Sequence, residues 1–363
     1  MISPSQKNKI ILLGPVPPPF GGVAIFLNNL YKNLRDPDIK FWTQTPVECS
    51  NNAIHIKSSL FKFPFLLLKD GRRSTVVDST LVFLEYPDQP LSFFWQTLRP
   101  ILGIKWIKII HDNSLPNRLP SFPFYERLLA KLALKTIDEF IVVNQDLFDW
   151  LKHDLKLKQK ITLVKPLLPI DLDLSAVTLP RELLSLAKAG KKLVCTVGTF
   201  VPQYGFRETA DTIEKLREEL GEDIRLIIVS GTFTNDSSYE EDVLRNRDWI
   251  SVVRDIPHRQ TLKIIQESDL AVRATSRESY GLTRVEAICL GTPVVATDFG
   301  ETRGVLTFEH GNHEEMKKQI KEGLYNFNPK SLSNWADQYK QEAQQNLRAF
   351  KDIIYKHDPH YEK

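Results

Sequence analysis

Short apolar runs alternate with amphipathic stretches along the chain, and this alternation predicts an α/β protein. In the first half, each short apolar run is predicted to be a buried parallel strand, because such strands are apolar on both faces. These runs are Lys9 to Leu13, Leu81 to Leu84, Ile107 to Ile110, Phe140 to Val143 and Ile161 to Val164. Helical periodicity fills the stretches Val23 to Leu34, Phe124 to Thr136 and Gln145 to Leu155. This order predicts a doubly wound sheet with helices on both faces.

The pattern is interrupted once and then restarts. Between Lys165 and Pro180, Pro166 and Pro169 break the periodicity, which indicates a linker. We therefore expect an N-terminal domain over residues 1–170 and a C-terminal domain over residues 171–363. The second set of predicted elements is strand Leu193 to Val197, helix Phe206 to Leu220, strand Ile224 to Val229, helix Gln260 to Glu267, strand Leu270 to Arg273, helix Thr283 to Leu290 and strand Val294 to Thr297.

The C-terminal tail is predicted to be one long helix. Leu332 to Tyr355 is polar apart from a stripe formed by Trp335, Tyr339, Leu347, Phe350 and Ile354. We expect this helix to pack over the domain junction and to cross back to the N-terminal domain. Two doubly wound domains in series are expected to face each other across a cleft, with ligands at the carboxyl ends of their strands.

Composition and charge narrow the class of protein. The chain has 363 residues, 42% of them hydrophobic, and a formal charge of +3, which is too small to predict a nucleic-acid-binding surface. Its three cysteines, Cys49, Cys195 and Cys289, show no metal-binding or disulfide spacing, as expected for a cytoplasmic protein. No apolar run is long enough for a membrane span, and no secretory signal precedes the first strand.

Two segments mix bulky apolar side chains with Lys and Arg. They are Ser59 to Arg73 and Trp95 to Ile110. Two interpretations stay open for each: contact with a membrane surface, or core packing with solvated charges.

The densest candidate chemistry lies in the segment from Arg273 to Asp298. A strand is predicted to end at Arg273, a polar loop carries Glu278, Gly281 permits a tight turn, and a helix begins near Thr283. The start of that helix offers free N–H groups and a positive dipole end, which suit a diphosphate. Glu278 and Glu286 flank this position and can accept hydrogen bonds from hydroxyl groups. An alternative is that Thr283 and Glu286 form only a capping box.

This segment resembles the glutamate-x7-glutamate signature of family 4 glycosyltransferases, and Gly291-Thr-Pro-Val-Val-Ala-Thr is similar to the turn and strand that follow it there. The resemblance implies a retaining enzyme of the GT-B fold, with two Rossmann-like domains. It implies that Glu278 touches the transferred sugar and that Glu286 holds the nucleotide ribose. The donor-binding residues that we expect in this segment are Arg273, Arg277, Glu286 and the stretch of Ser279, Tyr280, Gly281, Leu282 and Thr283.

The N-terminal half has weaker counterparts. Gly21 and Gly22 open a helix after a loop too long and proline-rich for dinucleotide binding, and they are similar to the family's first loop, whose glycines face the donor phosphates. His111 follows a predicted strand and resembles the family's histidine near the reacting sugar, although a lone histidine is often structural. Glu85 and Tyr86 end another predicted strand and are expected to face the acceptor.

The chain departs from the family where two cations normally clamp the donor diphosphate. Thr199 stands in place of the arginine and Tyr204 in place of the lysine. A diphosphate without compensating charge in a partly dry site would be costly. We expect Arg273, Arg277 and Arg303 to supply that charge, since the guanidinium fork suits phosphate oxygens. The alternative is that these arginines only pair with neighbouring carboxylates.

The sequence thus predicts a metal-independent, hexosyltransferase-type enzyme that moves a sugar from a nucleoside diphosphate sugar to a hydroxyl, without a cofactor. No aspartate-x-aspartate cluster lies where a metal-dependent enzyme would need one. Relatives suggest surface polysaccharide or glycolipid assembly in bacteria, with a lipid-linked acceptor at the inner face of the membrane and peripheral membrane contact. Two alternatives remain: a sugar-nucleotide epimerase of the same build, and a non-catalytic GT-B subunit of a glycosyltransferase complex.

Overall fold

A computed structural model describes residues 9–17, 21–34, 36, 38–43, 53–55, 68–69, 71, 74–79, 99–168, 172–181, 183, 191–231 and 235–356. The chain forms two compact units. The first comprises Met1–Pro18, Gly22–Leu167 and Gln344–Lys363, and the second comprises Pro19–Gly21 and Leu168–Ala343. In the described part of the chain, no helix is both long and apolar enough to cross a bilayer.

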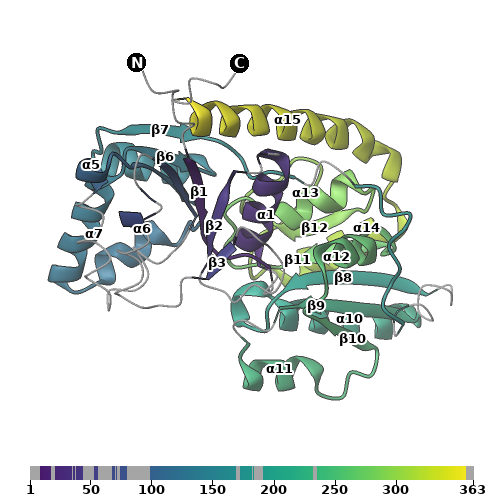
Figure 1. Ribbon diagram of the computed structural model, residues 1–363. Coiled ribbons are helices and arrows are strands. Elements are labelled where there is room, and N and C mark those ends of the chain that lie inside the picture. The colour runs from purple at the N-terminus through teal and green to yellow at the C-terminus, as the bar shows by residue number, and fades with distance from the viewer. Residues whose placement is uncertain are drawn as a thin grey trace. The chain divides into compact units, whose positions relative to one another are not determined.

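The first unit is built on a seven-stranded parallel sheet in the order β3-β2-β1-β4-β5-β6-β7 (Figure 1). The strands are β1 (Lys9–Leu13), β2 (Lys40–Thr43), β3 (Ala53–His55), β4 (Ser74–Asp78), β5 (Lys105–Ile110), β6 (Glu139–Val142) and β7 (Lys160–Leu163). The direction of strand addition reverses between β1 and β4, which are paired over the full length of both. This reversal is the feature that defines a doubly wound sheet.

Helices cover both faces of this sheet. They are α1 (Gly22–Leu34), α5 (Arg99–Leu102), α6 (Leu115–Arg118), α7 (Phe124–Thr136) and α8 (Gln145–Asp149), with a 3-10 turn at Leu119–Ser121 and a π turn at Trp150–Asp154. One core lies beneath α6, α7 and α8, and the other lies beneath α1 and the last turns of the C-terminal helix. The predicted helix from Gln145 to Leu155 is therefore an α-helix that continues as a π turn.

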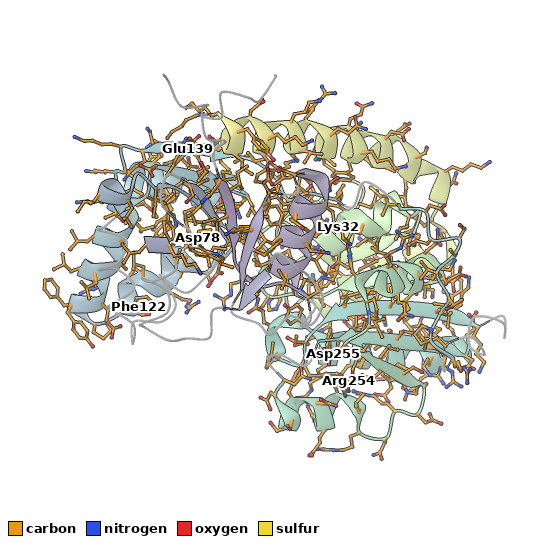
Figure 2. The ribbon with its side chains drawn as sticks, viewed as in Figure 1. Lys32, Asp78, Phe122, Glu139, Arg254 and Asp255 are labelled. Carbon is orange, nitrogen blue, oxygen red and sulfur yellow. The ribbon has the colours of Figure 1, made fainter. Side chains whose placement is uncertain are left out.

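Strand β4 was not predicted from the sequence. Its sequence is Ser-Thr-Val-Val-Asp, all five residues of which are buried, and Asp78 lies in the interior of the unit (Figure 2). The side chain of Asp78 is compensated, because Lys108 Nζ lies 3.0 Å from Oδ1 and the Trp106 indole donates to Oδ2 at 3.1 Å. A buried carboxylate paired in this way is tolerated within a strand. The predicted strand Leu81 to Leu84 lies outside the described residues.

The second unit contains a six-stranded parallel sheet in the order β10-β9-β8-β11-β12-β13. Its strands are β8 (Lys192–Gly198), β9 (Ile224–Ser230), β10 (Ile250–Arg254), β11 (Leu270–Arg273), β12 (Val294–Thr297) and β13 (Leu306–Phe308). Here the reversal falls between β8 and β11. The loops that follow these two parallel strands leave the sheet at the same edge.

Six helices are assigned to the described part that includes this unit: α10 (Phe206–Leu220), α11 (Ser237–Leu244), α12 (His258–Gln266), α13 (Leu282–Cys289), α14 (His313–Tyr325) and α15 (Ser333–Tyr355). Short 3-10 turns lie at Pro202–Tyr204 and Pro329–Leu332. The core beneath α12 and α13 also takes in Tyr339 and Ala343 of α15. Later residues of α15, Phe350 and Ile354, belong to a core of the first unit.

The loop after β8 is held tightly against the loop after β11 at Gly205. This residue has φ +65° and precedes α10, and a Cβ added to it would collide with the carbonyl oxygen of Ala274. Only glycine meets both demands, the left-handed backbone and the close approach. Gly221 ends the same helix at φ +67°, but an added Cβ there would meet no atom within 4 Å.

These two glycines form a matched pair for mutation. Gly221→Ala is expected to lower the free energy of unfolding by about 1 kcal/mol, the cost of the left-handed conformation alone. Gly205→Ala adds the backbone collision and is expected to cost at least about twice as much. Urea unfolding of both variants beside the wild type measures the difference. Equal losses would show that the two loops are not packed as described.

Candidate functional site

The carboxyl ends of β8 and β11 define the strongest candidate site. The order of strands reverses between them, and open α/β sheets bind ligands where such a reversal occurs. Gly198 ends β8 and Arg273 ends β11, so the loops that carry Thr199, Tyr204 and Glu278 leave the sheet beside each other. The backbone joins these loops directly, since the amide of Ser276 donates to the carbonyl of Gln203 at 3.0 Å.

Arg273 connects the two loops with its guanidinium group. Its Nη2 donates to Glu278 Oε2 at 2.7 Å, and its Nη1 donates to the carbonyl oxygen of Val197 on β8. The guanidinium carbon lies over the ring of Tyr204, 5.3 Å from the centroid. The side chain is only 9% exposed, and its Nε finds no hydrogen-bond acceptor among the described residues. A buried donor of this kind is costly unless a ligand satisfies it.

Tyr204 is fixed beneath this arginine by its contact with Gly198. A Cβ added to Gly198 would lie 2.7 Å from Cγ of Tyr204, so the ring packs directly on the backbone. Thr199 is half-buried, and its Oγ1 makes no hydrogen bond within the described part of the chain. Of the two positions that depart from the family pattern, Tyr204 therefore lies against Arg273, and Thr199 directly follows the end of β8.

Helix α13 begins at Leu282 directly after Glu278 and its loop. Gly281 is the N-cap at φ +86°, and no side chain of the described residues caps the helix. The capping-box alternative is wrong, because Thr283 is already the second helical residue and cannot act as the N-cap. The first amides of α13 are consequently left without a side-chain acceptor, as a site for an anion requires.

Arg284 is a residue of this site that the sequence analysis missed. It is fully buried in the first turn of α13. Its Nη1 donates to Thr297 O at 2.9 Å and to the carbonyl of Phe299, and its Nη2 lies 3.3 Å from Thr275 Oγ1. Burial lowers the pKa of Arg284 to about 10, so it remains a cation at neutral pH. It ties the ends of β11 and β12 to the helix that follows Glu278.

Glu286 lies two residues further along α13, in its second turn, and is also buried, with 3% exposure. Nε2 of His258, the first residue of α12, lies 2.9 Å from its Oε1. Sequence analysis did not find His258 either, because no local pattern links it to Glu286.

The other predicted residues of this unit fall in different places. Arg303 is held by Glu301 at 2.9 Å and by Glu342 of α15 at 2.6 Å, and it stacks on Tyr339. Arg277 is exposed. Of the remaining loop residues, Ser279, Leu282 and Thr283 are half-buried, whereas Tyr280 is buried and packs in the core.

In the first unit, His111 follows β5 and packs edge-on against Phe26 of α1, with the ring centroids 4.7 Å apart. Its Nε2 is buried and has no hydrogen-bond partner among the described residues. Burial, together with the charge of Lys108, lowers the pKa of His111 to about 3, so the imidazole is neutral at physiological pH. Gly21 and Gly22 are exposed at the start of α1. Glu85 and Tyr86 lie outside the described residues.

The lowered pKa of His111 predicts a pH dependence of stability. In the unfolded chain the imidazole takes up a proton near pH 6.5, whereas in the folded protein it does so only near pH 3. Stability is therefore lost as the pH falls between these values, by up to roughly 1.4 kcal/mol per pH unit. His111→Gln removes this contribution, so the variant should gain up to about 2 kcal/mol on the wild type between pH 6.5 and 5. Urea titrations at these pH values test it; parallel losses in both proteins would contradict a buried neutral imidazole.

Comparisons with known proteins agree with this geometry. Residues 185–327 match the family model for glycosyl transferases group 1. No curated protein sequence matches significantly. Among solved structures, sucrose-phosphate synthase from Thermosynechococcus elongatus is 16% identical with a TM-score of 0.67, each chain being covered to 96%. HepE of Anabaena in complex with UDP-glucose is 14% identical with a TM-score of 0.74, over 96% of this chain and 99% of that one.

A UDP-forming trehalose-phosphate synthase from Burkholderia xenovorans, solved with glucose-6-phosphate, is 12% identical with a TM-score of 0.73, over 96% of this chain and 99% of that chain. These identities establish similarity of fold. The expected fold class is confirmed: the chain has the two-unit α/β fold of GT-B glycosyltransferases, and its second unit carries the sequence pattern of the group 1 glycosyl transferases.

Proposed function

We propose that this protein is a retaining glycosyltransferase that moves a sugar from a nucleoside diphosphate sugar to a hydroxyl acceptor. The observation that carries the proposal is the pairing of Arg273 with Glu278 at the point where the strand order of the second unit reverses. The family match over residues 185–327 covers the same loops. HepE, which shares this fold, is described in complex with UDP-glucose, which supports a donor of the same class.

The donor would lie along the start of α13. Its diphosphate would accept hydrogen bonds from the amides of Leu282 and Thr283, which no side chain of the described residues caps and where the helix dipole also favours an anion. Glu278 would hold the sugar and Glu286 the ribose, as the resemblance to family 4 implies. Negative charge that develops on the leaving diphosphate would be stabilised by fixed donors rather than by mobile water.

Arg273 is the residue best placed to replace the missing clamp. Its guanidinium stacks on Tyr204, the side chain that stands in place of the family's lysine, and its Nε lacks an acceptor among the described residues. Arg303 is less suited, because Glu301 and Glu342 already satisfy its charge. We therefore assign the main contact with the diphosphate to Arg273, supported at longer range by the buried charge of Arg284.

The remaining features of the proposal rest on the resemblance alone. They are metal independence, a role for neutral His111 next to the reacting sugar, and an acceptor bound by the first unit. The proposal also includes a lipid-linked acceptor at the inner face of a bacterial membrane, used in the assembly of surface polysaccharide or glycolipid. The main competing proposal is a non-catalytic subunit, which the replacements at Thr199 and Tyr204 favour.

Arg273→Ala separates the two proposals. Uridine, guanosine and thymidine diphosphate sugars are first compared by calorimetry to find the donor that binds. The variant should then bind this sugar nucleotide about 2 to 5 kcal/mol more weakly, with little change for the nucleoside, because the nucleoside has no phosphate to neutralise. Thr199→Arg with Tyr204→Lys should restore part of the loss.

Arg303→Ala is the matched control, since it removes a cation that is already paired with carboxylates. It should bind the donor as the wild type does. If Arg273→Ala also binds the donor as tightly as the wild type, Arg273 does not neutralise the diphosphate. In that case another group neutralises the diphosphate, whereas a wild type that binds no donor of the panel would favour the non-catalytic subunit.

A further inference from the structure

Glu286 is a buried carboxylate that faces one basic side chain. It is 3% exposed, and within the described residues the basic group found against it is the imidazole of His258, whose Nε2 lies 2.9 Å from Oε1. Glu286 Oε1 also accepts no hydrogen bond of standard geometry within that part of the chain. A carboxylate taken out of water without full hydrogen bonding destabilises the fold unless a ligand completes its shell.

The position of His258 follows from the topology. Strand β10 ends at Arg254, and the chain turns through Asp255, which has the left-handed φ of +47°, before α12 begins at His258. Helices α12 and α13 each follow a parallel strand, so both begin at the carboxyl edge of the sheet. They share one core through Ile264, Ile265 and Ile288, which places the start of α12 beside the second turn of α13.

We propose that His258 is a positioning residue for the donor ribose. It rests on the proposed function, in which Glu286 binds the ribose hydroxyls, and it assigns the orientation of that carboxylate to a residue of a different helix. His258 is 16% exposed, so its imidazole lies at the margin of the site, while the side chain of Glu286 is 4% exposed.

The imidazole faces Oε1 at 2.9 Å and so restricts the orientation of the carboxylate, which in the proposed function presents its other oxygen to the ribose. Two vicinal hydroxyls are the groups that a carboxylate fixed in this way binds best, because each can donate to an oxygen held at a set position. His258 thereby determines a preference for ribose over a sugar without hydroxyls at these positions.

The test compares nucleotides that differ only in the ribose. Binding of UDP, GDP and ADP to the intact protein identifies the preferred base, and that nucleotide is then compared with its 2′,3′-dideoxy form. In the wild type the ribose form should bind at least about tenfold more tightly. His258→Leu should reduce this ratio to about twofold by weakening the ribose form alone. His258→Gln keeps an N–H donor close to the position of Nε2 and should retain most of the preference.

A purely structural role for His258 predicts a different result, because disturbed packing of α12 on α13 would weaken both forms of the nucleotide equally. Equal weakening, or no change in either form, would overturn the proposal while leaving the proposed function intact. If the wild type binds neither these three diphosphates nor thymidine diphosphate, the proposed function fails and this inference fails with it. Binding of thymidine diphosphate alone, which lacks the 2′-hydroxyl, would overturn the inference and leave the proposed function intact. Circular dichroism and the melting temperature show whether His258→Leu is folded. If it is misfolded, His258→Gln and Glu286→Gln provide the comparison. Glu286→Gln must then lose the ribose preference, and His258→Gln must keep it.

Discussion

The need to compensate buried carboxylates shapes the carboxyl edge of the second sheet. Glu278 and Glu286 are both withdrawn from water, and each meets a basic side chain from another element: Arg273 at the end of β11 and His258 at the start of α12. An uncompensated charge in such a place would cost several kcal/mol. Two further contacts hold the loops that carry these partners. Gly205 packs closely on Ala274, and the buried cation Arg284 donates to the carbonyl of Thr297.

Under the proposed function, this arrangement would explain how a donor site persists without the two cations that the resemblance to family 4 leads one to expect. The departure at Thr199 and Tyr204 removes charge from the loop after β8, but Arg273 returns a cation to the same place from the neighbouring strand. The first unit solves a similar problem in a different way. There Lys108 pairs with buried Asp78, and His111 is kept neutral by burial instead of being paired. A neutral imidazole can donate or accept a hydrogen bond near a reacting sugar without adding charge.

The parts of the fold that the sequence predicted are those in which strands are apolar on both faces, such as β1, β8 and β11. Strands β2, β3 and β4 were not predicted, because short strands with polar ends resemble loops unless their partners are known. The burial of Arg284 could have been predicted from helical spacing, since Arg284 lies four residues before Ile288, on the face of α13 that is buried. The role of His258 could not have been predicted from the sequence, because its contact with Glu286 forms only when α12 packs against α13. The two glutamates were found because they lie within one short segment.

The most direct test of the account is a turnover measurement. The protein is incubated with uridine, guanosine and thymidine diphosphate sugars, with water as the acceptor where none is added, and nucleotide and sugar are followed by chromatography and NMR. The account predicts that one donor is consumed with release of the free nucleoside diphosphate, and that Glu278→Ala abolishes this release, since contacts with the moving sugar strengthen in the transition state. Conversion of the sugar with the nucleotide link intact would instead indicate an epimerase. Absence of both binding and turnover would contradict a donor site at this edge of the sheet.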